Sequence, residues 1–157
     1  KSLGNCIYLA DEPETIRQKV MGMYTDPNHL RIEDPGQVEG NTVFTYLDAF
    51  CKEEDFVNYL PEYKNLDELK EHYRRGGLGD VKLKKFLNEI LQAKLKPIRE
   101  RRKELEAHIE DVYAVLKEGT IAANQYCDMV LKRVKEAMGI DYFTNDALLK
   151  VQQEKGQ

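Results

Sequence analysis

The longest regular pattern in the chain runs from Asp80 to about Ala107, where apolar residues recur at the spacing of an α-helix. At 100° per residue, one side of this helix carries Leu83, Phe86, Leu87, Ile90, Leu91, Leu95 and Ile98. Such a side must be buried against other elements. The pattern therefore predicts a helical domain built on one long helix, which Pro97 is expected to kink because proline lacks a backbone donor.

Shorter stretches before and after this helix show the same spacing. We expect further helices over about residues 12–24, 43–50, 56–60, 65–75, 109–118 and 120–138. Residues 25–41 contain two prolines and two glycines, which predict a long loop. No convincing pair of strands is present. The predicted fold class is therefore all-α, a helical bundle with a kinked long helix.

The length of 157 residues suits one main domain. We expect a leading segment over residues 1–10, a helical domain over 11–143, and a weakly ordered tail over 144–157. No apolar run approaches the roughly 18 residues of a membrane span, and no signal peptide is evident. The expected location is the cytoplasm, without membrane contact.

Cysteine and histidine are sparse and scattered. The three cysteines are odd in number and lack C-x-x-C spacing, so free thiols are expected rather than disulfides or a zinc site. The three histidines have no Glu or Cys at metal-ligand spacing. We therefore predict no metal site.

Positive charge is concentrated on the long helix. Between Val81 and Lys103 there are nine basic and two acidic residues, although the whole chain has a net charge of -4. One side of the helix, opposite the apolar one, carries Lys85, Lys96, Arg99 and Lys103. For a charge run taken by itself, the favoured explanation is a solvated outer face with some ion pairs to neighbouring acidic residues. A focused contact with a polyanion is the alternative, since the acidic chain as a whole does not suit indiscriminate binding of nucleic acid.

A glycine-rich run, RRGGLGDVK over residues 74–82, precedes the long helix. Free backbone amides in such a run can bind an anion, but the spacing is not that of a P-loop. A tight turn between helices is the other interpretation. Asp80 favours the turn, because its carboxylate would repel a phosphate.

Five stretches of the chain carry a family resemblance. They are KSLGN at 1–5, DEPETI at 11–16, YTDP at 24–27, YRRGGLGDVK at 73–82 and PIRERR at 97–102. The first resembles the back half of the KMSKS loop of class I aminoacyl-tRNA synthetases. In this order, from Lys1 to about Phe143, the stretches resemble the bacterial tryptophanyl-tRNA synthetases, and the patterns around Thr25 and Gly79 are similar to the tryptophan branch.

The resemblance implies a function for the parent enzyme and a limited one for this chain. Enzymes of the family attach tryptophan to its tRNA with ATP and magnesium, and their helical tail binds the anticodon. By this resemblance Lys1 and Ser2 match loop residues that bind the ATP phosphates. The chain is then expected to be a C-terminal fragment without the N-terminal catalytic domain, inactive alone and without a cofactor of its own. The parent is expected to be a homodimer.

A tRNA-binding module needs basic residues for phosphates and polar or aromatic side chains for splayed bases. The basic side of the long helix supplies the phosphate contacts. Candidates for base contacts are Asn65, Tyr73 and Arg74. Their alternative roles are a helix cap, a core aromatic residue and an exposed arginine.

Thr25 and Asp26 follow the first expected helix in the position of a family Thr-Asp-Pro turn, so we expect them at a hinge or interface between domains. The carboxylates of residues 53–55 are expected to cap a helix. A helical interaction or scaffold domain without tRNA binding remains the alternative function.

Overall fold

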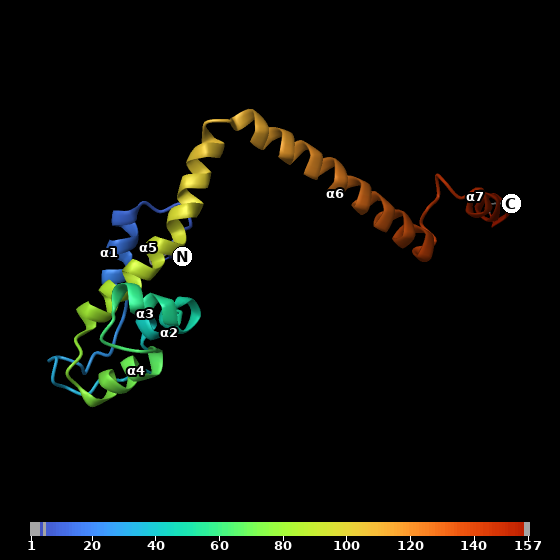
Figure 1. Ribbon diagram of the computed structural model, residues 1–157. Helices are drawn as coiled ribbons and strands as arrows, with labels where there is room; N and C mark the ends of the chain where they lie inside the picture. Colours follow the sequence, from blue (N-terminus) through green and yellow to red (C-terminus); the bar gives the residue numbers. More distant parts are fainter. Residues whose placement is uncertain (1–3, 5, 156–157) are drawn as a thin grey trace. The chain divides into compact units, whose positions relative to one another are not determined.

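The computed structural model describes residue 4 and residues 6–155, and over these residues the chain is helical and contains no strand. The predicted all-helical fold is confirmed. Figure 1 shows the helices in order: α1 (Pro13–Met21), α2 (Thr42–Phe50), α3 (Glu53–Tyr59), α4 (Leu66–Arg75), α5 (Asp80–Glu106), α6 (Ile109–Met138) and α7 (Asp146–Lys155).

The chain divides into two compact units, the first ending at Glu104 and the second beginning at Leu105. The expectation was one domain over 11–143 and a weakly ordered tail. In the structure, residues 146–155 form helix α7. The buried core belongs to the first unit, because no residue of α6 or α7 is buried.

The core is built on the apolar side predicted for the long helix. Its buried members on α5 are Leu83, Phe86, Leu87, Ile90, Leu91 and Leu95. The other helices of the first unit add Ile16, Val20, Val43, Phe44, Leu47, Phe56, Leu69 and Tyr73. Burial of each large apolar side chain contributes about 1.5–3 kcal/mol, so α5 anchors the unit. Ile98 is 43% exposed and marks where the core ends along α5.

The observed length of α6 differs from the sequence prediction at one helix boundary. The sequence predicted two helices separated at Gly119, but α6 runs unbroken from Ile109 to Met138. A glycine inside a helix costs only about 1 kcal/mol relative to alanine, which the neighbouring turns outweigh. The real end is at Gly139, whose φ of 63° is the left-handed conformation of a helix C-cap.

The predicted caps are present. The Asn65 side chain accepts a hydrogen bond of 2.9 Å from the Glu68 amide at the start of α4. The Asp55 carboxylate accepts one of 2.8 Å from the Lys52 amide at the start of α3. Both bonds satisfy backbone donors that a helix start leaves without partners.

The glycine-rich run before α5 is a tight turn. Gly76 has a φ of +89°, and a Cβ there would lie 2.2 Å from the Glu33 carbonyl oxygen. The Gly77 amide donates a hydrogen bond of 2.6 Å to the Ile32 carbonyl. The turn therefore packs on the loop after α1, and these bonds occupy the Gly76 and Gly77 amides that an anion site would need.

Candidate nucleic-acid interface

Three of the four predicted cationic side chains on α5 are exposed. Lys85 and Lys103 have neither an ion pair nor a side-chain hydrogen bond within the described residues. Lys96 Nζ lies 3.9 Å from Glu100 Oε1, and both side chains are more than 60% exposed, so this ion pair is weak. Eighteen residues separate Lys85 from Lys103, which is about 27 Å along a helix. We call Lys85, Lys96 and Lys103 the basic side of α5.

Arg99 differs from this group. It is only partly exposed, and its Nη2 donates a hydrogen bond of 3.1 Å to Gln92 Oε1. Its Nη1 is buried without a partner in the described part of the chain. Gln92 in turn donates to the Pro13 carbonyl at the start of α1. Arg99 is therefore turned toward the α1–α5 packing, which corrects its expected place beside the lysines.

The three residues predicted to contact bases have different roles in the structure. Asn65 caps α4, as described above. Arg74 is exposed and forms an ion pair of 2.7 Å with Glu39, which lowers the pKa of that carboxyl group. Tyr73 is fully buried at 0% exposure. A base has no access to the Tyr73 ring, so the structure contradicts the predicted contact and supports the alternative role in the core.

A partly buried polar cluster surrounds Asp80, and the sequence did not predict it. Asp80 Oδ1 accepts a hydrogen bond of 2.8 Å from the Tyr73 hydroxyl and lies 3.2 Å from His29 Nδ1. Asp80 Oδ2 accepts one of 2.7 Å from the Thr25 hydroxyl. Asn41 donates to the Tyr73 oxygen at 3.3 Å. Burial and the Asp80 carboxylate raise the pKa of Tyr73 far above its ordinary value, so Tyr73 stays a neutral donor.

Asp26 holds the loop between α1 and α2. Its carboxylate accepts backbone hydrogen bonds of 2.9 Å from Asn28 and 2.8 Å from Gln37, which lower its pKa. Thr25 and Asp26 therefore serve as anchors within the first unit. Their expected role at a hinge or interface between domains stays a prediction.

A hollow of about 490 Å³ lies beside α4 and the start of α5. Glu62 and Lys82 form an ion pair of 2.6 Å in its wall, which lowers the pKa of Glu62 and raises that of Lys82. The Tyr63 hydroxyl lies 2.7 Å from His72 Nδ1. These residues were not predicted as a site, because segments on either side of α4 must meet to form it.

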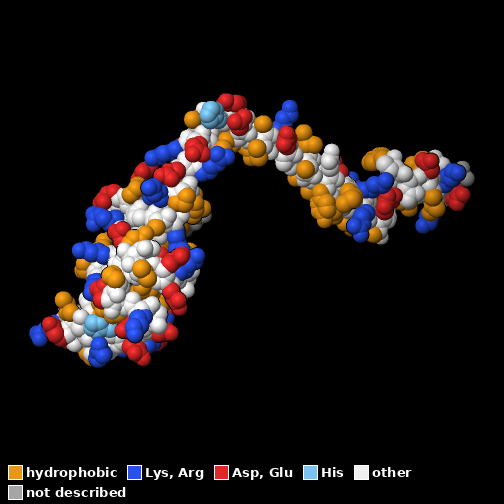
Figure 2. Space-filling model, viewed as in Figure 1, with side chains coloured by type: hydrophobic (Ala, Val, Ile, Leu, Met, Phe, Trp, Pro, Cys, Tyr) orange, Lys and Arg blue, Asp and Glu red, His pale blue; other side chains and the backbone are white. Residues whose placement is uncertain are grey.

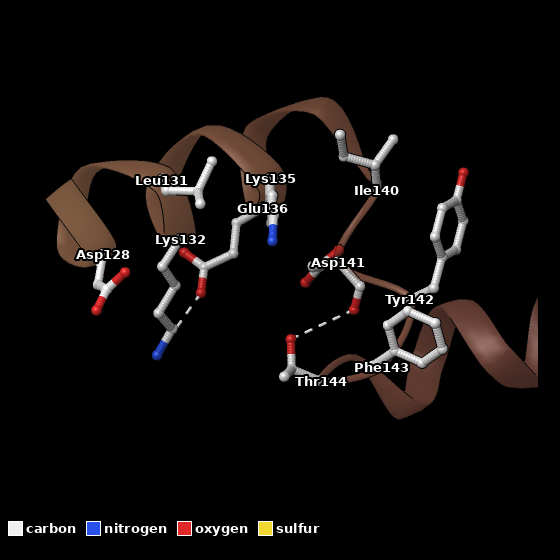
Figure 3. A pocket seen from close by; sticks show the side chains of 10 residues that line it. All are labelled: Asp128, Leu131, Lys132, Lys135, Glu136, Ile140, Asp141, Tyr142, Phe143 and Thr144. Atoms are coloured by element: carbon white, nitrogen blue, oxygen red, sulfur yellow. Dashed lines mark hydrogen bonds and ion pairs between the residues drawn. The ribbon is translucent and has the colours of Figure 1, made fainter. Parts of the chain in front are cut away.

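A second hollow, of about 450 Å³, lies within the second unit where α6 ends (Figure 3). Lys132 and Lys135 line it together with three carboxylates, those of Asp128, Glu136 and Asp141. Lys132 Nζ is 3.9 Å from Glu136 Oε1. Because acidic side chains outnumber basic ones here, this hollow does not suit a phosphate.

Charge and apolar surface are distributed differently over the two units. Figure 2 shows Lys and Arg side chains interspersed with Asp and Glu over the first unit, and apolar side chains along α6. Those of α6 include Tyr113, Leu116, Tyr126 and Met138, each at least 59% exposed. The basic side of α5 is thus a local feature on a surface of mixed charge.

No helix of the described residues is long and apolar enough to cross a membrane. The same residues contain no cluster of three or more His, Cys, Asp or Glu side chains that could hold a metal ion. Lys1 and Ser2, the predicted ATP-loop residues, lie outside the described residues.

Comparison with known proteins places these features in a family. The family model for class I tRNA synthetases (W and Y) matches residues 1–96. A tryptophan–tRNA ligase of Clostridium longisporum is 61% identical over 145 residues, which are 92% of this chain and 40% of the relative. A tryptophan–tRNA ligase of Streptococcus pyogenes serotype M3 is 53% identical over 143 residues, which are 91% of this chain and 40% of that relative.

A crystal structure of tryptophanyl-tRNA synthetase from Campylobacter jejuni has a TM-score of 0.64 and 25% sequence identity to the chain. The match covers 88% of this chain and 41% of that one. The chain thus spans about 40% of the length of the curated relatives it matches.

Proposed function

We propose that this chain, which belongs to the family of class I tRNA synthetases for tryptophan and tyrosine, is the anticodon-binding part of a tryptophan–tRNA ligase. Support for the tryptophan member comes from relatives named tryptophan–tRNA ligase that are 50–61% identical over about nine-tenths of the chain. Because the chain spans 40% of those relatives, the catalytic part lies in the remainder of the proposed enzyme.

The proposal extends to the whole enzyme. It attaches tryptophan to tryptophan tRNA in the cytoplasm, using ATP with magnesium, and acts as a homodimer. Lys1 and Ser2 belong to the loop that binds the ATP phosphates. The chain alone binds tRNA and catalyses no reaction.

The basic side of α5 is the observation that carries the proposal. Its three lysines are exposed along about 27 Å of one helix, and they are not held by strong ion pairs. Lysine binds phosphate as a flexible point charge, so a row of lysines can follow a nucleic-acid backbone without reading sequence. The core on the opposite side reaches Leu95 and keeps this part of α5 rigid, so Lys85 and Lys96 hold a defined register on the RNA.

Binding of a tryptophan tRNA transcript to the full chain tests the proposal. The wild type is expected to bind with an affinity that falls steeply with salt and drops when the anticodon is changed. Replacing Lys85, Lys96 and Lys103 together with Gln should reduce the slope of log affinity against log salt by about 2.1–2.7, since each of the three lost phosphate contacts contributes about 0.7–0.9.

A matched variant replaces three exposed lysines that do not belong to the basic side of α5, Lys64, Lys117 and Lys150, with Gln. It changes the net charge equally and should leave the slope nearly unchanged. If the slope falls equally in the two variants, total charge governs binding and the basic side of α5 does not.

A helical interaction domain is the second candidate function. The exposed apolar side chains of α6 favour it, since contiguous apolar surface marks contacts with other proteins. This candidate predicts no tRNA affinity and no anticodon dependence, so the same titration separates the two functions.

A further inference from the structure

Helix α6 carries an apolar stripe with the spacing of a coiled coil. The stripe begins at Ile109 and ends at Ala137, and its nine members follow one another at alternating steps of four and three residues. Eight of them are apolar, the ninth is Thr120, and none is charged. Such a repeat over about four heptads is the pattern of a helix that packs along its length against another helix. We call these nine residues the seam of α6.

No described residue of the second unit covers the seam. No residue of α6 is buried, and Ile109, Tyr113 and Leu116 are each at least 53% exposed. Helix α7 has 10 residues against the 30 of α6, so it is too short to cover the seam. Exposed apolar surface of this extent marks a contact with another protein.

The two ends of the seam complement each other in shape. Near the C-terminal end, Val130, Val134 and Ala137 line an open hollow of about 600 Å³ on the surface of α6. Near the N-terminal end, the large side chain of Tyr113 is 68% exposed. In a coiled coil, each side chain of the seam inserts into a hole between residues of the facing helix. Tyr113 has the size of such a knob, and the hollow at the other end is a hole for it.

We propose that the partner of the seam is a second copy of this chain, whose α6 runs antiparallel to the first. When the two helices are paired around residue 125, Tyr113 of each copy faces Ala137 of the other, and Cys127 faces Ala123. Each contact then occurs twice, as in a two-fold symmetric dimer. A parallel pair would instead set Tyr113 against Tyr113 and Ala137 against Ala137, so that one layer is overfilled and another is left with a gap.

The positions beside the seam set no like charges against each other in this arrangement. Lys117 lies opposite Leu131 of the second copy, and Arg133 lies opposite Gly119. The two Asn124 side chains face each other across the two-fold axis, where each amide can both donate and accept a hydrogen bond. The pairing therefore costs no charge repulsion.

The length of the seam suits a specific dimer. The seam and the positions on both its sides comprise about 20 residues along about 42 Å of helix, and a stable interface takes about 20–30 residues from each partner. The absence of charge from the seam also matches the core of such interfaces. This inference goes beyond the proposed function and does not depend on tRNA binding.

Sedimentation equilibrium of the full chain at a series of micromolar concentrations tests the dimer. The wild type is expected to reach twice the mass of one chain as the concentration rises. Val134→Glu places a charge in the seam and should raise the dissociation constant at least about tenfold, because the charge would be buried without a partner.

Val115→Glu makes the same substitution on α6 outside the seam, at a side chain that is 69% exposed. It should change the dissociation constant by less than about twofold. Circular dichroism checks that α6 stays helical in both variants, as expected because glutamate is a good helix former.

Cross-linking tests the antiparallel order. In this order the two Cys127 residues lie about 6 Å apart along helices whose axes are about 8–10 Å apart, which is too far for a disulfide. Treatment with oxidised glutathione should therefore leave the wild-type helices unlinked. Ala123→Cys should give a covalent dimer joined between position 123 of one copy and Cys127 of the other, and peptide mapping by mass spectrometry identifies the link.

Three results would overturn the inference. A chain that stays monomeric at every concentration would leave the seam to a different protein, or to the part of its relatives' length that the chain does not span. Equal weakening by Val134→Glu and Val115→Glu, or none by Val134→Glu, would place the dimer contact elsewhere. A disulfide between the two Cys127 residues of the wild type would refute the antiparallel order.

Discussion

The Thr25 hydroxyl donates a hydrogen bond of 2.7 Å to Asp80 Oδ2, across a separation of 55 residues. The bond joins the loop after α1 to the first residue of α5. Two of the stretches that carry the family resemblance, YTDP and the glycine-rich run, therefore meet in space. The orientation of α5, and with it the direction of the basic side, depends in part on this contact.

Thr25→Val should destabilise the first unit by about 1.5–3 kcal/mol, because it removes a hydrogen bond to a partly buried carboxylate. Urea unfolding followed by circular dichroism measures the loss. Thr120→Val on the exposed surface of α6 serves as the control and should change stability much less. Equal effects would show that the Thr25–Asp80 bond adds nothing specific.

Gly76→Ala and Gly119→Ala should shift stability in opposite directions. At Gly76 the new Cβ would lie 2.2 Å from the Glu33 carbonyl oxygen, and the φ of +89° is strained for alanine, so a loss of at least about 1–3 kcal/mol is expected. At Gly119, in the middle of α6, nothing lies within 4 Å, and alanine should increase helix stability by up to about 1 kcal/mol. Melting temperatures of the two variants check both signs.

Asp26 should make the loop after α1 sensitive to acid. Backbone hydrogen bonds hold its pKa below the ordinary value of 3.8 in the folded state. Its stabilising contribution is therefore fully present above pH 3.8 and is lost as the pH falls through the lower, folded pKa. Unfolding measured over a series of acidic pH values should show a weaker pH dependence for Asp26→Asn than for the wild type. Asp128→Asn, at an exposed position, should keep the wild-type dependence.

Arg99 and Lys103 should contribute unequally to tRNA binding. Arg99 is partly buried and bonded to Gln92, whereas Lys103 is exposed. Lys103→Gln should therefore reduce the salt slope by about 0.7–0.9, and Arg99→Gln by clearly less. Filter binding at several salt concentrations gives both slopes, and a larger effect at Arg99 would contradict the proposed interface.

The helices and the core side of α5 could be predicted because helical spacing is a local property. The helical spacing of 100° per residue was enough to place Leu83 and Leu87 in the core, and both are fully buried. The same spacing placed Lys85 and Lys103 on the exposed side of the helix. It placed Arg99 with them, but a long side chain can turn along the helix toward a partner such as Gln92.

The candidate base contacts could be predicted less well. Tyr73 is polar at its tip and lies next to Arg74, so its sequence position fits a surface contact as well as the core. Its burial follows from neighbours on other helices, such as Phe44, whose ring centroid lies 5.1 Å away. The hollow beside α4 could not be predicted, because Glu62 and Lys82, which also line it, come from segments on either side of that helix.

The sequence by itself determined the helical class, most helix boundaries and the separation of apolar from basic sides on α5. These depend on residues within a few turns of one another. Only the tertiary structure decided which polar groups are held inside the protein and which are open to a ligand. The Thr25 and Tyr73 hydroxyls both donate to the Asp80 carboxylate, because folding brings the loop after α1, helix α4 and the start of α5 together.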